Sequence, residues 1–347
     1  MAGGQGVLVV VGALGWTLTI GLILALLALD IAQALRPHEI HFREATLWSV
    51  FYIAVAIAFG LVFASVVGWD YGVEYFAGYL VEKSLSVDNL FVFVIIMSVF
   101  AVPVEHQHKI LIFGIIAALA LRAIFIAIGA TLISLFSFMF LLFGLLLVGT
   151  AVQLYRHRHE DPDIENNLLV RTSRRLLPVT TDYHGGKLVV TSGGVRMVTP
   201  LAIVLIAIGG TDILFALDSI PAVFGVTEQA YIVFVANAFA LLGLRALYFL
   251  VHGLLDRLVY LSTGLAVILA FIGVKLILHW GHGVDDWVPE ITTPVSLVVI
   301  AAVLAVTTVA SLLKVRRDPT ARAHAGAVLG APSRTRPRPP ERRGPRT

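Results

Sequence analysis

Four carboxylates lie inside two apolar stretches of this sequence, and both stretches follow one pattern. The first reads G-Y-L-V-E-K-S-L-S-V-D-N-L-F-V-F and contains Glu82 and Asp88; the second reads G-G-T-D-I-L-F-A-L-D-S-I-P-A-V-F and contains Asp212 and Asp218. In each copy the two acids are six residues apart. Carboxylates are costly at membrane depth and are kept there mainly to line a path or to bind an ion. The duplicated pattern therefore predicts a cation pathway.

Small polar residues near these acids extend the predicted set of oxygen ligands. They are Ser84, Ser86, Asn89, Thr211, Ser219 and Asn237. Carboxylate, hydroxyl and amide oxygens together suit hard divalent ions such as Mg²⁺, Ca²⁺ and Mn²⁺. The chain contains no cysteine, so disulfides and thiolate metal sites are both excluded.

Helix geometry limits how the acids can meet. Residues six apart on a continuous helix point about 120° from each other, so one ion site needs a broken helix or convergence of both copies. Gly209 and Gly210 precede Asp212, and Pro221 lacks the N–H that the carbonyl of Leu217 would accept. We therefore expect a helix break in the second copy, with free carbonyls as further cation ligands.

Four basic residues also lie within the apolar stretches, and they are Lys83, Arg122, Arg245 and Lys275. Because these bases formally balance the four acids, loading a divalent ion requires either proton release or movement of a basic partner. This balance predicts that ion transport is coupled to protons. Two alternatives stay open: the bases are counter-ions or reach toward the membrane surface, and the acids form only structural salt bridges.

The composition is that of a multi-spanning, all-α membrane protein. Of 347 residues, 58% are hydrophobic and 14% are charged, and the mean hydropathy is +0.91. About nine stretches approach the ~20 residues that span a bilayer. We predict spans near 7–29, 47–68, 73–101, 109–129, 132–155, 198–226, 230–251, 258–279 and 294–313. A cell-membrane location follows.

Outside the predicted spans, lysine and arginine occur only in alternate segments, which would lie on one side of the membrane. The N-terminal tail and the loops after the second, fourth, sixth and eighth predicted spans contain none. The positive-inside rule then places the N-terminus outside and the C-terminus in the cytoplasm. The net charge of +3 reflects this topology, and we expect no nucleic-acid partner. The outer loop with His279, His282, Asp285, Asp286 and Glu290 is either a weak cation-attracting mouth or a loop without a specific role.

The repeat extends beyond the acids. A-L-A-L-R-A-I-F around Arg122 matches A-L-L-G-L-R-A-L-Y-F around Arg245. Because the third and sixth spans are an odd number of crossings apart, the two copies enter the membrane from opposite sides. This inverted repeat is typical of secondary transporters, whose site lies near the midplane where the repeats meet.

The sequence divides into five parts. They are 1–46, a first span and cytoplasmic loop; 47–155, a membrane domain with the first acidic repeat; 156–197, a cytoplasmic loop; 198–313, a membrane domain with the second acidic repeat; and 314–347, a basic cytoplasmic tail. Alternation around T-S-G-G in the cytoplasmic loop predicts a short β-hairpin. The tail is rich in Pro and Arg, and we expect it to be disordered.

Both acidic motifs, together with R-R-L-L-P-V-T in the cytoplasmic loop, closely resemble the TerC family, which includes the Alx proteins. The resemblance runs from Trp69 to Leu313. It implies a LysE-related transporter that exports manganese as its substrate and is linked to tellurium resistance. By motif position the ion ligands would be Glu82, Asp88, Asn89, Asp212, Asp218 and Ser219.

Two features bear on what the resemblance implies. Many members have an acid where this chain has Gly209, so ion number or affinity can differ here. Four carboxylates also repel an oxyanion such as tellurite, so we expect tellurium resistance to be indirect.

Alternative functions remain open at this level. Carboxylates also suit the ammonium group of a basic amino acid, as in a LysE-type exporter, and two aspartates could serve an intramembrane protease. A further alternative is an accessory membrane protein that passes metal to exported enzymes and binds the secretion machinery. We expect a transporter and not an enzyme, with no cofactor. We also expect the chain to contact membrane lipid, metal ions and a homo-oligomeric partner.

Overall fold

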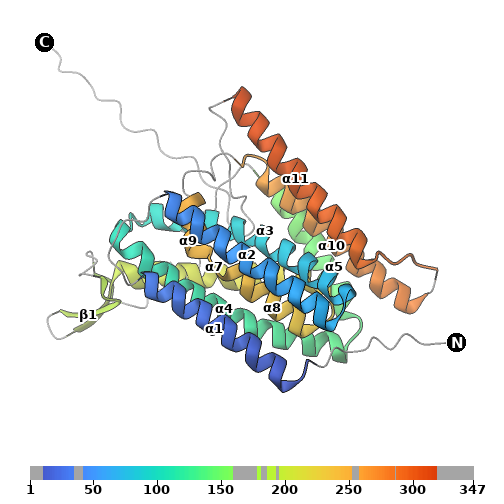
Figure 1. Cartoon of the computed structure of the whole chain (residues 1–347). Coiled ribbons are helices and arrows are strands. Elements are labelled where there is room, and N and C mark those ends of the chain that lie inside the picture. The colour runs from blue at the N-terminus through green and yellow to red at the C-terminus, as the bar shows by residue number, and fades with distance from the viewer. Residues whose placement is uncertain are drawn as a thin grey trace, which may run out of the picture.

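The computed structural model shows a bundle of long helices with one small β-hairpin (Figure 1). It describes residues 11–34, 42–158, 178–180, 186–192, 195–251, 258–285 and 287–318. The helices are α1 (Ala13–Ala34), α2 (Phe42–Val67), α3 (Trp69–Val99), α4 (Val104–Leu135), α5 (Met139–Arg156), α7 (Pro200–Phe224), α8 (Ala230–Leu241), α9 (Leu244–Val251), α10 (Leu261–Val284) and α11 (Thr293–Arg317). The expected all-helical membrane architecture is confirmed, whereas the tail beyond residue 318 and most of the 156–197 loop lie outside the described residues.

The number of membrane spans differs from the predicted nine. Seven helices of the described chain are long and apolar enough to cross a membrane, and the bent pair α8 and α9 makes up to eight. Helix α3 has 31 residues, but its charged side chains set it apart from this group. They are Asp70, Glu74, Glu82, Lys83 and Asp88. The predicted count of nine is therefore not confirmed, although α3 is long enough to be the ninth.

The expected helix break at the second acidic motif is absent. Helix α7 continues through Gly209 and Gly210 and ends at Phe224, with Pro221 inside its last turn. A proline so close to the C-terminal end removes one hydrogen bond without interrupting a long helix on its other side. The discontinuity instead lies between α8 and α9, which bend by 41°.

Gly243 produces this bend. Its φ of +76° lies in the left-handed region, which glycine adopts without strain. A Cβ at this position would also come within 2.6 Å of the Tyr52 ring on α2. The matching position of the first repeat is Ala120, where α4 stays continuous. The two copies of the repeat are therefore locally different at the arginine that each carries.

Helices α3 and α7 run antiparallel through the centre of the bundle. At one end Phe93 and Met97 of α3 pack in one apolar cluster with Val204 near the start of α7. At the other end Val81 shares a cluster with Val223 near the end of α7. The two acidic motifs therefore meet in opposite directions, as an inverted repeat requires; the symmetry of the complete repeats stays a prediction.

The two ends of the bundle carry different structures. At one end Thr19 of α1 bonds Tyr231 of α8, and Thr293 of α11 donates to the carbonyl of Val226. At the other end lies the hairpin of β1 (Val189–Ser192) and β2 (Val195–Val198), which leads into α7 (Figure 1). The hairpin predicted around T-S-G-G is confirmed. Which end faces the cytoplasm stays a prediction.

Candidate ion site

One arginine lies at the centre of the buried polar groups. Arg122 of α4 and Glu82 of α3 are both fully buried and form an ion pair. Nη1 of Arg122 also donates to Oδ1 of Asn237 on α8 at 2.7 Å, and Nη2 lies 3.5 Å from Oδ1 of Asp212 on α7. This guanidinium thus links four helices, and it joins the first acid of one repeat to the first acid of the other.

The amide of Asn89 completes this cluster. With its oxygen turned toward Arg122, Asn89 accepts from Nη2 at 3.0 Å, and its nitrogen donates to the carbonyl of Leu85 at 3.0 Å. The orientation is the one in which both amide groups are satisfied. The structure therefore brings Glu82, Asn89 and Asp212 together around a single positive charge. We call these three residues, with Arg122 and Asn237, the arginine cluster.

Asp88 lies in the same helix as Glu82 but has a different environment. It is 6% exposed, and its Oδ1 forms no hydrogen bond within the described parts of the chain. The hydroxyls of Ser86 and Ser219 and Oδ2 of Asp212 are also buried, and they too form no hydrogen bond within the described parts of the chain. A buried acceptor left unpaired costs about 1–3 kcal/mol, more when it is charged. These oxygens match the ligands that a hard divalent cation would use.

The fourth carboxylate faces another helix. Asp218 is half-buried and accepts a 2.9 Å hydrogen bond from Oγ1 of Thr150 on α5. Among the described residues, no three His, Asp or Glu side chains are arranged to hold a metal ion. The four acids are thus not gathered into one cluster. Sequence reasoning missed Thr150, for which a lone hydroxyl in the apolar stretch L-L-L-V-G-T-A-V was the available signal.

Two of the four bases face acids outside the site. Arg245 of α9 pairs with Asp30 of α1, with Nε and Nη2 each 3.1 Å from Oδ1. Both side chains are buried. Asp30 was not predicted as a partner, because it lies outside the repeat. Lys275 of α10 lines a separate pocket with Glu74. Lys83 stays near the site and donates to the carbonyl of Ala240 at 3.1 Å.

The formal charge of the site therefore differs from the balance expected from the sequence. Taken together across α3 and α7, the four predicted acids Glu82, Asp88, Asp212 and Asp218 have two bases near them among the described residues, Arg122 and Lys83. This leaves a formal charge of about −2 if all are ionised. A buried charge needs a partner, a proton or a bound ion. This deficit equals the charge of one divalent cation.

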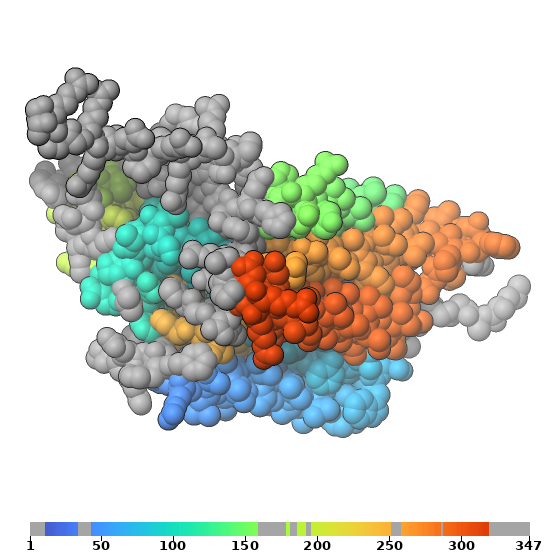
Figure 2. All heavy atoms as spheres, turned by 90° about the horizontal axis from the view of Figure 1, so that it is seen from above, coloured from blue at the N-terminus to red at the C-terminus, as the bar shows by residue number. Residues whose placement is uncertain are grey.

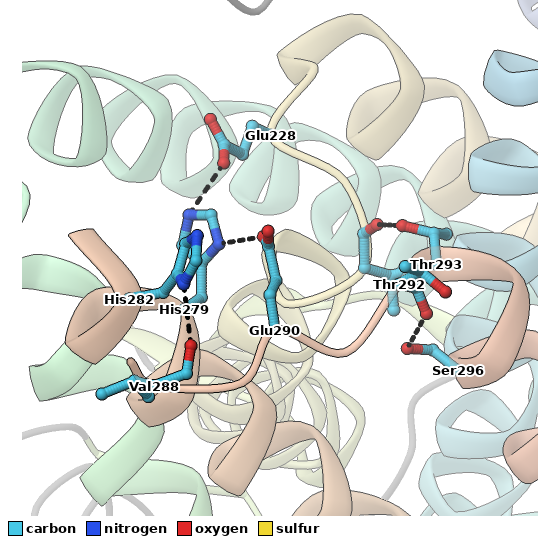
Figure 3. A network of polar contacts seen from close by, with 9 residues as sticks. Glu228, His279, His282, Val288, Glu290, Thr292, Thr293 and Ser296 are labelled. Carbon is cyan, nitrogen blue, oxygen red and sulfur yellow. Dashed lines mark hydrogen bonds and ion pairs between the residues drawn. The ribbon is translucent and has the colours of Figure 1, made fainter. Parts of the chain in front are cut away.

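A second polar cluster lies at the loop end of the bundle (Figure 3). His279 of α10 contacts Glu228 through Nε2 at 3.1 Å and Glu290 through Nδ1 at 2.9 Å, so both ring nitrogens face carboxylates. The hydrogen bond from His279 lowers the pKa of Glu228. Glu74 and Lys275 join these three in lining a cavity of about 370 Å³.

The acidic outer loop expected from the sequence is partly present in this pocket. His279 and Glu290 belong to it, but Nδ1 of His282 lies 2.7 Å from the carbonyl of Val288 (Figure 3). Asp285 accepts from the backbone of Trp287 at 3.1 Å, and residue 286 lies outside the described chain. The pocket instead gains Glu74 from α3 and Glu228 from the loop before α8.

Comparison with known proteins identifies the family. Residues 67–319 match the Integral membrane protein TerC family. The chain belongs to the TerC family. The matched residues include both acidic motifs, Arg122 and the pocket around His279, whereas α1 with Asp30 precedes them.

Relatives of this TerC protein are similar over most of their length. A membrane protein of Mycobacterium tuberculosis is 47% identical over 317 residues, which cover 87% of this chain and 79% of that protein. A membrane protein of Myxococcus xanthus is 40% identical over 90% of this chain and 96% of its own length. A Photorhabdus laumondii protein, provisionally named membrane-bound redox modulator Alx, is 38% identical over 82% of this chain and 90% of its own. No solved structure shows a significant match.

Proposed function

We propose that this TerC protein exports divalent metal ions across the cell membrane, with Mn²⁺ as the foremost substrate. The observation that carries the proposal is the set of buried, unpaired acceptor oxygens on α3 and α7, which includes Asp88 Oδ1, Asp212 Oδ2 and Ser219 Oγ. Hard oxygen ligands of this kind suit Mn²⁺, Mg²⁺ and Ca²⁺. The formal deficit of two charges would be met by one such ion.

Arg122 gives this proposal a mechanism. Its guanidinium pairs with Glu82 and lies near Asp212, which are two of the predicted cation ligands. An ion that uses these carboxylates must therefore compete with the guanidinium for them. Movement of α3 relative to α7 would separate Glu82 from Asp212 and release one of them. We propose that Arg122 neutralises the acids when the ion has left and withdraws when the next ion binds.

Proton antiport follows from the same charges. A buried carboxylate with no positive partner is stable only when it holds a proton or a cation, because desolvation of the bare anion is too costly. Asp88 is buried, and no basic side chain of the described chain lies within ion-pair distance of it. A divalent ion that arrives there displaces protons. We therefore propose that up to two protons move inward for each exported ion.

The pocket around His279 fits the outer mouth of this pathway. It lies beside loops that contain neither lysine nor arginine, which the positive-inside rule places outside. Three glutamates and one lysine line it: Glu74, Glu228, Glu290 and Lys275. Excess negative charge in a cleft raises the local concentration of cations. We propose that the exported ion leaves through this pocket.

Metal export is also compatible with the family's link to tellurium resistance and with the name redox modulator that one relative carries. Because the chain has no cysteine, it cannot itself exchange thiols and disulfides. Effects on cellular redox state or on tellurium resistance would then follow from a changed concentration of a redox-active ion such as Mn²⁺.

Ion flux in proteoliposomes tests the proposed function. Purified protein would be reconstituted and the movement of Mn²⁺, Mg²⁺, Ca²⁺ and lysine compared under the same gradient. We expect Mn²⁺ to move faster than lysine by at least tenfold. Lysine flux without metal flux would favour the amino-acid exporter. Absence of flux for all four, with a secretion-machinery protein copurifying, would favour the accessory role.

A further inference from the structure

Helix α5, green in Figure 2, lies at the surface of the bundle. Helices α5 and α10 pack closely and run antiparallel, since Gly144 meets Gly273 and Phe140 meets His279. Their backbones touch at Gly144 and Gly273, where a Cβ on either residue would come within 2.7 to 2.8 Å of the carbonyl oxygen of the other. The Phe140 ring packs edge-on against His279 near the loop end. The two helices are therefore in direct contact along this half of the pair.

The other half of the pair is open. A groove of about 270 Å³ lies between the helices and is lined by Val148, Ala151, Val152, Tyr155, Arg156, Ala266, Val267 and Ala270. The alanines leave room that larger side chains would fill. Val152 and Val267 are 46% and 47% exposed, so the groove opens on the outer surface of the bundle. In a membrane-spanning protein this surface faces lipid, and an apolar groove of this kind accommodates an acyl chain.

Positive charge lies at one end of the groove. Arg156 is the last residue of α5 and is exposed, and its guanidinium forms no hydrogen bond or ion pair with the rest of the described chain. Arg158 follows it, with its guanidinium carbon 4.2 Å above the Tyr155 ring and Nη1 donating to the Tyr155 carbonyl at 2.7 Å. The groove thus combines an apolar floor with an unpaired guanidinium at its end and an aromatic ring beside it.

We infer that this groove binds an anionic phospholipid, with an acyl chain along the alanines and the phosphate at Arg156. Tyrosine and arginine at a helix end are typical of the membrane interface, where the ring lies at headgroup depth. The end of α5 lies opposite the pocket around His279, on the side that the charge distribution places in the cytoplasm. The cytoplasmic leaflet is the one that carries anionic lipid. Charge complementarity therefore selects phosphatidylglycerol-type lipid over a zwitterionic one.

This inference is independent of which ion the protein transports. The groove lies on the outer surface of α5 and α10, and none of its lining residues belongs to the arginine cluster or to the pocket around His279. Bound lipid would fix the position of α5, whose Thr150 holds Asp218, and so link membrane composition to the site.

Native mass spectrometry of the full chain tests the inference. The protein would be exchanged into detergent with phosphatidylglycerol or phosphatidylcholine of identical acyl chains, and the apparent affinity of the first bound lipid measured. We expect phosphatidylglycerol to bind at least fivefold more tightly. Arg156→Gln should remove this preference, and Val267→Phe, which fills the groove from an exposed position, should weaken both lipids. Glycerol phosphate without acyl chains should not compete.

Arg316→Gln is the matched control, because Arg316 is an exposed base in the last turn of α11 and does not line the groove. Its lipid preference should equal that of the wild type. Equal affinity for the two lipids in the wild-type protein, or the same loss in Arg316→Gln as in Arg156→Gln, overturns the inference. Melting temperatures of all variants separate loss of binding from loss of folding.

Discussion

Arg122 of α4 lies 3.5 Å from Asp212 of α7, so an arginine of the first repeat reaches an acid of the second. The corresponding arginine of the second repeat does not return this contact, because Arg245 pairs with Asp30 of α1. The difference begins at Gly243, where the bend between α8 and α9 redirects the residues that follow. The two repeats thus supply similar residues but use them differently: Arg122 contacts acids of both repeats, whereas Arg245 contacts neither acidic motif within the described parts of the chain.

Removing the charge of Arg122 is expected to destabilise the bundle. Arg122→Gln leaves Glu82 and Asp212 buried without a positive partner, a change that typically costs about 3–5 kcal/mol. The melting temperature in detergent should fall, and adding Glu82→Gln should recover part of the loss. Lys314→Gln is the control, since its pair with Asp318 is 43% exposed on both sides and contributes about 0–1 kcal/mol. Equal melting temperatures for Arg122→Gln and the control would contradict the central role of Arg122.

The bend at Gly243 gives a second prediction. Gly243→Ala places a Cβ against Tyr52 and forces a left-handed φ on a residue that disfavours it, at a cost of about 1–3 kcal/mol. Gly209→Ala is the matched control, because Gly209 lies inside α7 with open space around its Cβ position. That variant should be neutral or slightly stabilising. The melting temperatures of the two variants test this difference. A Gly243→Ala protein as stable as Gly209→Ala would show that the bend is not required.

These two glycine positions show what the sequence could and could not predict. Gly209 and Gly210 suggest a helix break by composition, yet glycine in a long buried helix costs only about 1 kcal/mol and packing overrides it. The break lies at Gly243, whose φ of +76° a glycine adopts without strain, and Tyr52 leaves no space for a side chain at this position. Contact with a residue so distant in sequence is not visible in local spacing.

The ion site also has features that the sequence predicted and features that it did not. Burial of Glu82, Asp88 and Asp212, and the antiparallel packing of their helices, followed from hydropathy and from the repeat. The pairing of each base with its acid could not be predicted, because ion pairs depend on which helices are neighbours. Asp30 and Thr150 lie outside the acidic motifs, so no repeat argument could assign them to Arg245 and Asp218. Two of the four bases counted in the expected balance, Arg245 and Lys275, face other acids for this reason.

Proton coupling predicts a dependence of flux on an imposed pH gradient. In proteoliposomes that contain Mn²⁺, a gradient that drives protons against the ion should accelerate Mn²⁺ movement severalfold. A pH-sensitive dye should record proton movement in the opposite direction to the ion. The formal deficit at Asp88 and its neighbours is the physical reason, since protons occupy carboxylates that the ion has left. Mn²⁺ flux that does not change with the pH gradient would contradict proton antiport.

The predicted orientation can be tested by cysteine labelling, because the chain has no cysteine of its own. Thr191 of β1 is exposed at the hairpin end, and Gly283 near the end of α10 has open space for a side chain. In intact cells an impermeant thiol reagent should label Gly283→Cys and not Thr191→Cys. After permeabilisation both should react. Labelling of both in intact cells would place the two ends of the bundle on one side of the membrane and overturn the predicted topology, on which the proposed transport mechanism depends.

The proposed ion pathway is tested most directly by Mn²⁺ flux through Asp88→Asn in proteoliposomes, measured per reconstituted protein. Asparagine keeps the size of the side chain but removes the charge that attracts the cation, so we expect at least a tenfold loss of flux. Asp70→Asn is the matched control, because Asp70 is an exposed acid in the first turn of the same helix. The account predicts that Asp70→Asn transports at the wild-type rate while Asp88→Asn does not. Wild-type flux through Asp88→Asn would contradict it.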